Sequence, residues 1–144
     1  MAAILPKFID AGTTKVVTDF QQSVLAASFT TSTAGYEDTG LVVTVTVAST
    51  SDLVDFSLMG WGNASISQVF LVAYKVDSGT TQLVMQVDGA TGDSCNLSFR
   101  NIITGLSAGT HTIKIQIKAA TGTATLRYHG TDNEVPTLNA LVLH

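Results

Sequence analysis

The chain has 144 residues, the length of one domain, and a formal net charge of −4. Charged residues make up 12% of the sequence, against about 25% in an ordinary soluble domain. The negative charge argues against nucleic-acid binding, which needs clustered cations, and the single cysteine, Cys95, excludes an intrachain disulfide. With so few charges on the surface, we expect part of it to be buried against copies of the chain or a partner. A soluble sandwich coated with Thr and Ser is the alternative.

Residues 1–22 are predicted to form an extended N-terminal arm. Its apolar residues lie on both sides of Pro6, which cannot donate to a β-ladder. They are Ile4, Leu5, Phe8 and Ile9. Such an arm could tie one subunit to another, or it could be an edge strand of the same domain. Because the segment has no basic start and its apolar run is broken at Pro6 and Lys7, we expect neither a signal peptide nor a membrane span, and synthesis in the cytoplasm.

The pattern over residues 23–144 predicts short strands separated by turn signals. The expected strands cover residues 23–30, 41–48, 53–61, 66–76, 82–87, 94–103, 111–119, 124–128 and 138–143. The Gly-Trp-Gly-Asn sequence at residues 60–63 is expected to break a strand, and residues 120–123 to form the tight turn of a hairpin. The pattern predicts an all-β fold, an antiparallel jelly-roll β-sandwich of about eight strands, with an immunoglobulin-like sandwich as the alternative.

The strand predicted over residues 111–119 has the clearest alternation. Ile113, Ile115 and Ile117 have one parity and polar residues have the other, so one side faces the core and the other faces water. His111 shares the parity of the isoleucines. We therefore expect His111 to be a hydrogen-bonded structural histidine.

Residues that could carry catalysis or bind a metal do not form a recognisable motif. None of the three histidines has a metal-ligand spacing to another or to the cysteine, and no Gly-x-Ser-x-Gly sequence occurs. Asp88 with Asp93, or Asp132 with Glu134, could bind a cation, but each pair supplies few ligands and Asp-Gly is common in turns. We expect a protein that is not an enzyme and needs no cofactor or metal.

Three aromatic residues are the best candidates for contacts with a partner, namely Tyr36, Trp61 and Tyr128. Trp61 stands out because it lies between two glycines at the end of a predicted strand. Buried interface cores are enriched in Trp and Tyr. The alternative for Trp61 is a position at the edge of the core.

Three sequences near the C-terminus carry a family resemblance. They are Leu-x-x-Gly-Thr-His-Thr-Ile-x-Ile-x-Ile at residues 106–117, Gly-Thr-Ala-Thr-Leu at 122–126, and the strand at 138–143. Together they resemble the closing strands of jelly-roll domains in phage virion proteins, and they are similar to trimeric complement-C1q-like and tumour-necrosis-factor-like domains. The Gly-x-His-x-Ile part also occurs in carbohydrate-binding modules.

The resemblance implies a capsid decoration or cement protein. Such a protein would be a homotrimer that binds the major capsid protein on the outer surface of the virion. The alternative is a carbohydrate- or receptor-binding module of a phage fibre, which would hold a glycan against Tyr36, Trp61 or Tyr128.

Overall fold

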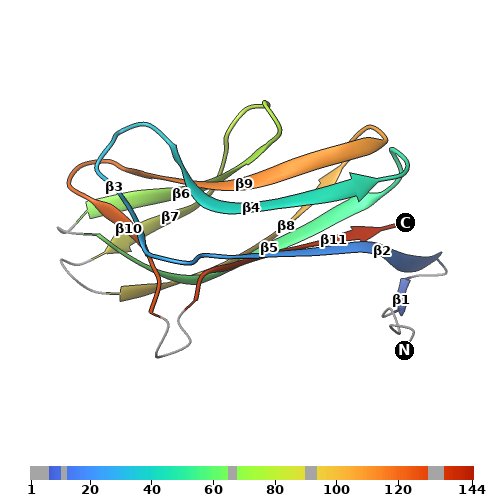
Figure 1. Ribbon diagram of the computed structural model, residues 1–144, viewed down its shortest axis with the longest axis horizontal. Coiled ribbons are helices and arrows are strands. Elements are labelled where there is room, and N and C mark those ends of the chain that lie inside the picture. The colour runs from blue at the N-terminus through green and yellow to red at the C-terminus, as the bar shows by residue number, and fades with distance from the viewer. Residues whose placement is uncertain (1–6, 11–12, 65–67, 90–93, 130–134) are drawn as a thin grey trace.

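The computed structural model describes residues 7–10, 13–64, 68–89, 94–129 and 135–144, which form two stacked antiparallel β-sheets (Figure 1). The strands are β1 (Lys7–Asp10), β2 (Thr13–Val24), β3 (Phe29–Thr31), β4 (Glu37–Val47), β5 (Leu53–Ala64), β6 (Gln68–Val76), β7 (Gln82–Gly89), β8 (Ser94–Thr104), β9 (Gly109–Ala119), β10 (Ala124–Arg127) and β11 (Thr137–Leu143). Among these residues there is no helix long and apolar enough to cross a membrane.

The strand order in the two sheets is that of a jelly roll. One sheet contains β2-β11-β5-β8 and the other β4-β9-β6-β7. Along the chain these strands change sheet at every step except from β6 to β7, which pair with each other. An immunoglobulin-like sandwich instead groups its strands as ABED and CFG. The predicted jelly-roll sandwich is therefore confirmed, and the immunoglobulin-like alternative is wrong.

The short strands β1, β3 and β10 add to the first sheet. β10 lies beside β5 in line with β11, and β3 pairs with its other side. Because β9 lies in the opposite sheet, the predicted hairpin of residues 111–119 and 124–128 is wrong. The turn between them contains Gly122 at φ 67° and carries the chain from one sheet to the other. Alternation identifies a strand, but it does not identify the sheet that the strand joins.

Residues 13–22 lie in the sandwich sheet, whereas the sequence predicts that they belong to an arm. β2 pairs with β11 from Val24 opposite Thr137 onward, and Val17 of β2 is 2% exposed. The pairing of β2 with β11 therefore crosses residue 22, where the sequence predicts the boundary between the arm and the sandwich. The predicted strand over residues 23–30 is also wrong, because the chain leaves β2 after Val24, where the Leu25 N–H donates to the carbonyl of Pro136 at 2.9 Å.

The Gly-Trp-Gly-Asn sequence does not break its strand, contrary to the prediction. β5 continues through it to Ala64 and pairs with β8 and β10 on its two sides. A Cβ atom on Gly60 would meet the Cβ of Pro136 at 3.0 Å. This glycine therefore allows a close approach of the segment that leads into β11, rather than a turn.

The core lies between the two sheets and follows the alternation of the strands. Its fully buried side chains include Leu41, Val45, Phe56, Leu58, Leu97, Ile113, Ile115, Ile117, Leu126 and Leu138. Phe56 of β5 contacts Tyr74 of β6, with ring centroids 4.8 Å apart, and Phe99 of β8, at 5.9 Å. The contact of Phe56 with Tyr74 connects the two layers of the sandwich, and that with Phe99 joins neighbouring strands of one sheet.

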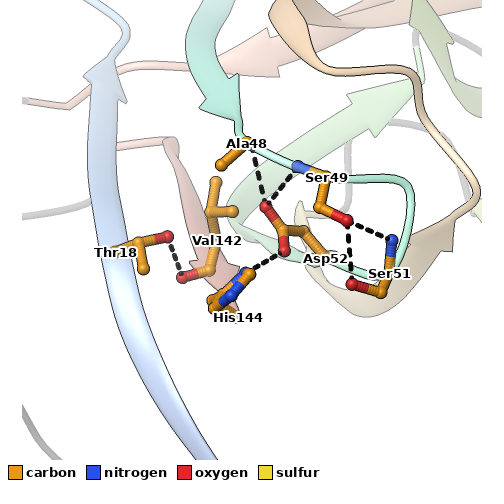
Figure 2. A network of polar contacts seen from close by, with 7 residues as sticks. All are labelled: Thr18, Ala48, Ser49, Ser51, Asp52, Val142 and His144. Atoms are coloured by element: carbon orange, nitrogen blue, oxygen red, sulfur yellow. Dashed lines mark hydrogen bonds and ion pairs between the residues drawn. The ribbon is translucent and has the colours of Figure 1, made fainter.

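A buried carboxylate fixes the turn between β4 and β5 to the end of β11 (Figure 2). Asp52 accepts hydrogen bonds from the N–H groups of Ala48 and Ser49 at 2.8 and 3.1 Å, and its other oxygen lies 2.5 Å from His144 Nδ1. The hydrogen bond with His144 and those from the two amides lower the pKa of Asp52. His144 is in turn paired through its backbone with Val16 of β2. This corner joins segments from both ends of the described chain.

His111 is buried and satisfied on both ring nitrogens, as expected. Nε2 donates to the carbonyl of Ser107 at 2.8 Å, and Nδ1 lies 2.8 Å from Asp77 Oδ2. The other oxygen of Asp77 accepts the Thr112 N–H at 2.7 Å. The hydrogen bonds with Asp77 and Ser107 raise the pKa of His111, and those from Thr112 and His111 lower the pKa of Asp77. The prediction of a structural histidine is confirmed.

Candidate interaction surface

The solvent side of the β2-β11-β5-β8 sheet, called the β5 face below, is the main candidate site. Strand alternation assigns its side chains, because residues that flank buried positions point outward. Its members are Phe20, Gln22 and Val24 of β2, Thr137, Asn139, Leu141 and Leu143 of β11, Leu53, Asp55, Ser57, Met59 and Trp61 of β5, and Asn96, Ser98, Arg100, Ile102 and Thr104 of β8.

Large apolar side chains gather on the β5 face and are well exposed there. The exposed fractions are 52% for Phe20, 51% for Val24, 60% for Met59 and 51% for Ile102. A soluble monomer rarely exposes a large contiguous apolar patch. This concentration on one side of one sheet therefore indicates a contact surface.

Strand register arranges the β5 face in rows that cross the strands. Phe20, Leu141, Asp55 and Ile102 lie side by side in one row. The neighbouring row is Gln22, Asn139, Ser57 and Arg100, and the row beyond it is Val24, Thr137, Met59 and Ser98. A polar row thus lies between two rows with apolar side chains.

A single ion pair occupies the middle of the β5 face. Arg100 Nε donates to Asp55 Oδ1 at 2.7 Å, and Arg100 Nη2 donates to Asp55 Oδ2. The side chain of Asp55 is 6% exposed, whereas that of Arg100 is 70% exposed. Because the two charges cancel, covering this face with a partner would not bury a net charge.

Two open hollows lie along the polar row. One, of about 360 Å³, is lined by Phe20, Asp55, Ser57, Arg100, Asn139 and Leu141. The other, of about 280 Å³, is lined by Met59, Gly60, Trp61, Asn96, Val135, Thr137 and Asn139. Asn139 stands between the hollows and accepts a hydrogen bond from Gln22 Nε2 at 2.8 Å. The second hollow, called the Trp61 hollow below, thus combines an aromatic ring with the side-chain amides of Asn96 and Asn139.

The opposite sheet presents a more charged surface. Lys114 Nζ lies 3.0 Å from Asp38 Oδ2, and Lys118 Nζ lies 4.6 Å from the centre of the Tyr36 ring. Gln116 Nε2 donates to Asp38 at 2.6 Å, and this bond is the main cause that lowers the pKa of Asp38. Burial raises the pKa of Tyr36. The two outer surfaces of the sandwich therefore differ in chemistry.

The aromatic residues predicted as contact candidates do not come together. Trp61 is partly exposed and lies on the β5 face, Tyr36 lies against Lys118 of the opposite sheet, and Tyr128, 37% exposed, follows β10. The arm residues Ile4 and Leu5 lie outside the described residues, and Phe8 and Ile9 are described only as the backbone of β1.

The most exposed apolar residues of the β5 face were not singled out from the sequence, and they include Phe20, Met59 and Ile102. Alternation was the signal that could have found the first of them. Phe20 and Val24 share one parity with the polar Gln22 between them, which is the pattern of one strand face. The prediction of an arm over these residues left that pattern unused.

Metal or thiol chemistry finds no support in the described residues. They contain no group of three or more His, Cys, Asp or Glu side chains that could hold a metal ion. Asp93, Asp132 and Glu134 lie outside the described residues, and the side chain of Asp88 is not described either. Cys95 Sγ donates to the carbonyl of Gly62 at 3.1 Å, and burial raises its pKa, which disfavours a reactive thiolate.

Comparison with known proteins gives likenesses in structure only. No family model and no curated protein matches the sequence. Among solved structures, the VP2 subviral particle of infectious bursal disease virus is 14% identical with a TM-score of 0.42, over 99% of this chain and 43% of the VP2 chain. Eiger TNF from S. frugiperda is 11% identical with a TM-score of 0.44, over 87% of this chain and 93% of that chain. TmCBM61 in complex with β-1,4-galactotriose is 18% identical with a TM-score of 0.34, over 86% and 69% of the two chains.

Proposed function

We propose that this chain is a non-enzymatic virion structural protein, a capsid decoration or cement protein that binds the outer capsid surface and stabilises the shell. Its partners are the major capsid protein and copies of itself in a homotrimer. The observation that carries the proposal is the β5 face, where exposed apolar side chains surround one internally neutralised ion pair. Such a surface is suited to packing against protein.

The dimensions of the β5 face support a protein contact. Four strands spaced about 4.8 Å apart, and a strand of 11 residues at about 3.4 Å each, give a footprint of roughly 700 Å². A standard protein interface covers about 800 Å² per partner. Burial of the apolar part contributes about 25 cal/mol per Å² before the entropic cost of association. One such face is thus large enough for a specific interface.

The proposal is tested on purified particles of the virus that carries this gene. We expect an antibody against the chain to label intact particles, and the particles to melt at a lower temperature when the chain is absent.

Phe20→Ser should reduce the amount of the chain bound to the particles about tenfold, because it removes an exposed ring from the β5 face. Leu83→Ser is the matched control, since Leu83 of β7 is 55% exposed on the other sheet. Intact particles that the antibody does not label, or a melting temperature that does not change when the chain is absent, would contradict the proposal.

The Trp61 hollow favours a second candidate, a carbohydrate- or receptor-binding module of a phage fibre. Trp61 and Asn96 make no side-chain hydrogen bond to the described residues, and Asn139 uses only its carbonyl oxygen. An aromatic ring beside unpaired amides can stack on a sugar ring and bind its hydroxyl groups. The hollow lies at one end of the β5 face, next to Val135.

Trp61→Ala tests this second candidate. If the chain binds glycans, the variant should lose at least tenfold in affinity on a glycan array or in calorimetry, because the stacking surface is removed. Leu83→Ala is the control for loss of an exposed apolar side chain outside the hollow. Glycan binding that Trp61→Ala leaves intact would remove the hollow as the binding site.

A further inference from the structure

We propose that β8, whose outer edge has no partner strand among the described residues, pairs along that edge with β8 of a second copy of this chain. The two antiparallel strands would join the β2-β11-β5-β8 sheets of the two copies into one continuous sheet. The partner is therefore another copy of the same chain, related by a two-fold axis that crosses β8. The proposal concerns the edge of the sheet and does not depend on a role in a virion.

In the part of the chain that the structure describes, the edge of β8 has little protection against strand addition. β8 pairs with β5 from Thr104 opposite Leu53 to Ser94 opposite Asn63, without a register shift. The strand contains no proline and one charged residue, Arg100. Natural proteins protect edge strands with charges, prolines, bulges or a covering segment. A straight edge of 11 residues with so little protection indicates that another strand covers it.

The backbone groups of this edge point away from the sheet. The Ile102 N–H donates to the Oδ1 of Asn101 at 2.9 Å, so it faces outward rather than toward β5. Because the hydrogen-bonding direction alternates along an antiparallel strand, the N–H groups of Asn96, Ser98 and Arg100 face outward too. These three have no hydrogen-bond partner among the described residues. An added strand would satisfy them.

Two other edges of the sandwich differ from that of β8. Side chains of β2 cover β4, where the Val42 N–H donates to Ser23 Oγ at 3.3 Å and the Thr46 N–H donates to Asp19 Oδ2 at 3.0 Å. The pairing of β7 with β6 has a register shift next to Val72. Such irregularities disfavour the addition of a strand. Among these edges, the one along β8 is the most open to a partner.

Charge and burial support a second copy as that partner. With the two-fold axis at Ser98, Arg100 lies opposite Asn96 of the second copy, so the two arginines do not meet. Arg100 also keeps its own counterion, Asp55. Phe99 and Ile103, which pack against the core and remain partly exposed, would be covered further. Antiparallel pairing of β8 with itself therefore buries apolar surface without opposing like charges.

Ser98→Pro tests the pairing by light scattering after size exclusion. The outward N–H of Ser98 makes no bond within the sheet, so proline at this edge position should leave the fold intact but block an added strand. We expect the wild-type mass to be an even multiple of 15.0 kDa, which is six copies where β8 pairing joins two of the proposed homotrimers, and Ser98→Pro to halve it. Ser98→Thr is the matched control and should keep the wild-type mass.

Asn96→Lys is a second, independent test of the pairing, for the case in which the proline at residue 98 disturbs β8. The new lysine would lie opposite Arg100 of the second copy, and edge lysines oppose strand addition. This variant should also halve the mass. An odd number of copies in the wild type, or an unchanged mass in both folded variants, would overturn the pairing. Particle labelling with the antibody tests the virion role separately, so either proposal can fail without the other.

Discussion

Phe56→Ala should lower the free energy of unfolding by about 3–5 kcal/mol, the range for removing a buried aromatic ring. Phe56 is 1% exposed and packs against Tyr74 and Phe99, with ring centroids 4.8 and 5.9 Å away. Its ring fills the space between the two sheets where β5, β6 and β8 meet. Alanine would leave a cavity that the strands cannot close, because each is held in register by its neighbours. Urea unfolding, with the midpoint and slope fitted separately, measures the loss.

Phe56→Leu is the matched variant for this prediction. It keeps much of the buried volume, so the loss of stability should be clearly smaller than that of alanine. A loss below about 1 kcal/mol for Phe56→Ala would contradict the role of this ring, because an exposed surface position gives changes of only about 0.5 kcal/mol. The comparison therefore separates cavity formation from a general sensitivity of β5 to substitution.

Local pattern accounts for most of the strands but not for their arrangement. The alternation of Ile113, Ile115 and Ile117 predicted β9 and its buried side, and all three side chains are 0% exposed. The same pattern could not show that β9 and β10 belong to different sheets, because the strands that pair with each of them lie elsewhere in the chain. Gly60 shows the same limit. Its contact with Pro136 requires the folded sheet, and the sequence shows only a glycine inside a strand pattern.

The candidate surface was predictable only in part. Trp61 was singled out from its residue type and its flanking glycines, and the structure places it in a hollow of the β5 face. Phe20 and Ile102 are far apart in the sequence and lie in one row only because β11 and β5 stand between their strands. Tyr36 was selected by the same criterion as Trp61, yet it contacts Lys118 on the other sheet. An exposed patch depends on strand order, which local sequence does not determine.

Arg100→Met should destabilise the protein more than removal of an ordinary surface cation. Arg100 itself is 70% exposed, but its partner Asp55 is 6% exposed. The substitution would leave the Asp55 carboxylate in a desolvated position without its counterion, and breaking a buried pair in this way is costly. The urea midpoint should fall relative to the wild type, at a protein concentration low enough to keep the chain dissociated. Lys75→Met is the control for removal of a cation from the other sheet and should change stability by no more than about 0.5 kcal/mol.

The double variant Asp55→Leu with Arg100→Met decides why the first substitution destabilises. Replacing both charges by apolar groups removes the unpaired carboxylate, so much of the lost stability should return. If the double variant is as unstable as the sum of the two single changes, the coupling energy between Asp55 and Arg100 is zero, and the unpaired carboxylate is not the cause of the loss. Recovery to the wild-type level would instead mean that an apolar β5 face is as stable in this fold as the ion pair, and that the ion pair is kept for another reason. Its position in the centre of that face makes specific contact with a partner the reason to test, since a charged pair there selects for a partner that can accept hydrogen bonds from Arg100.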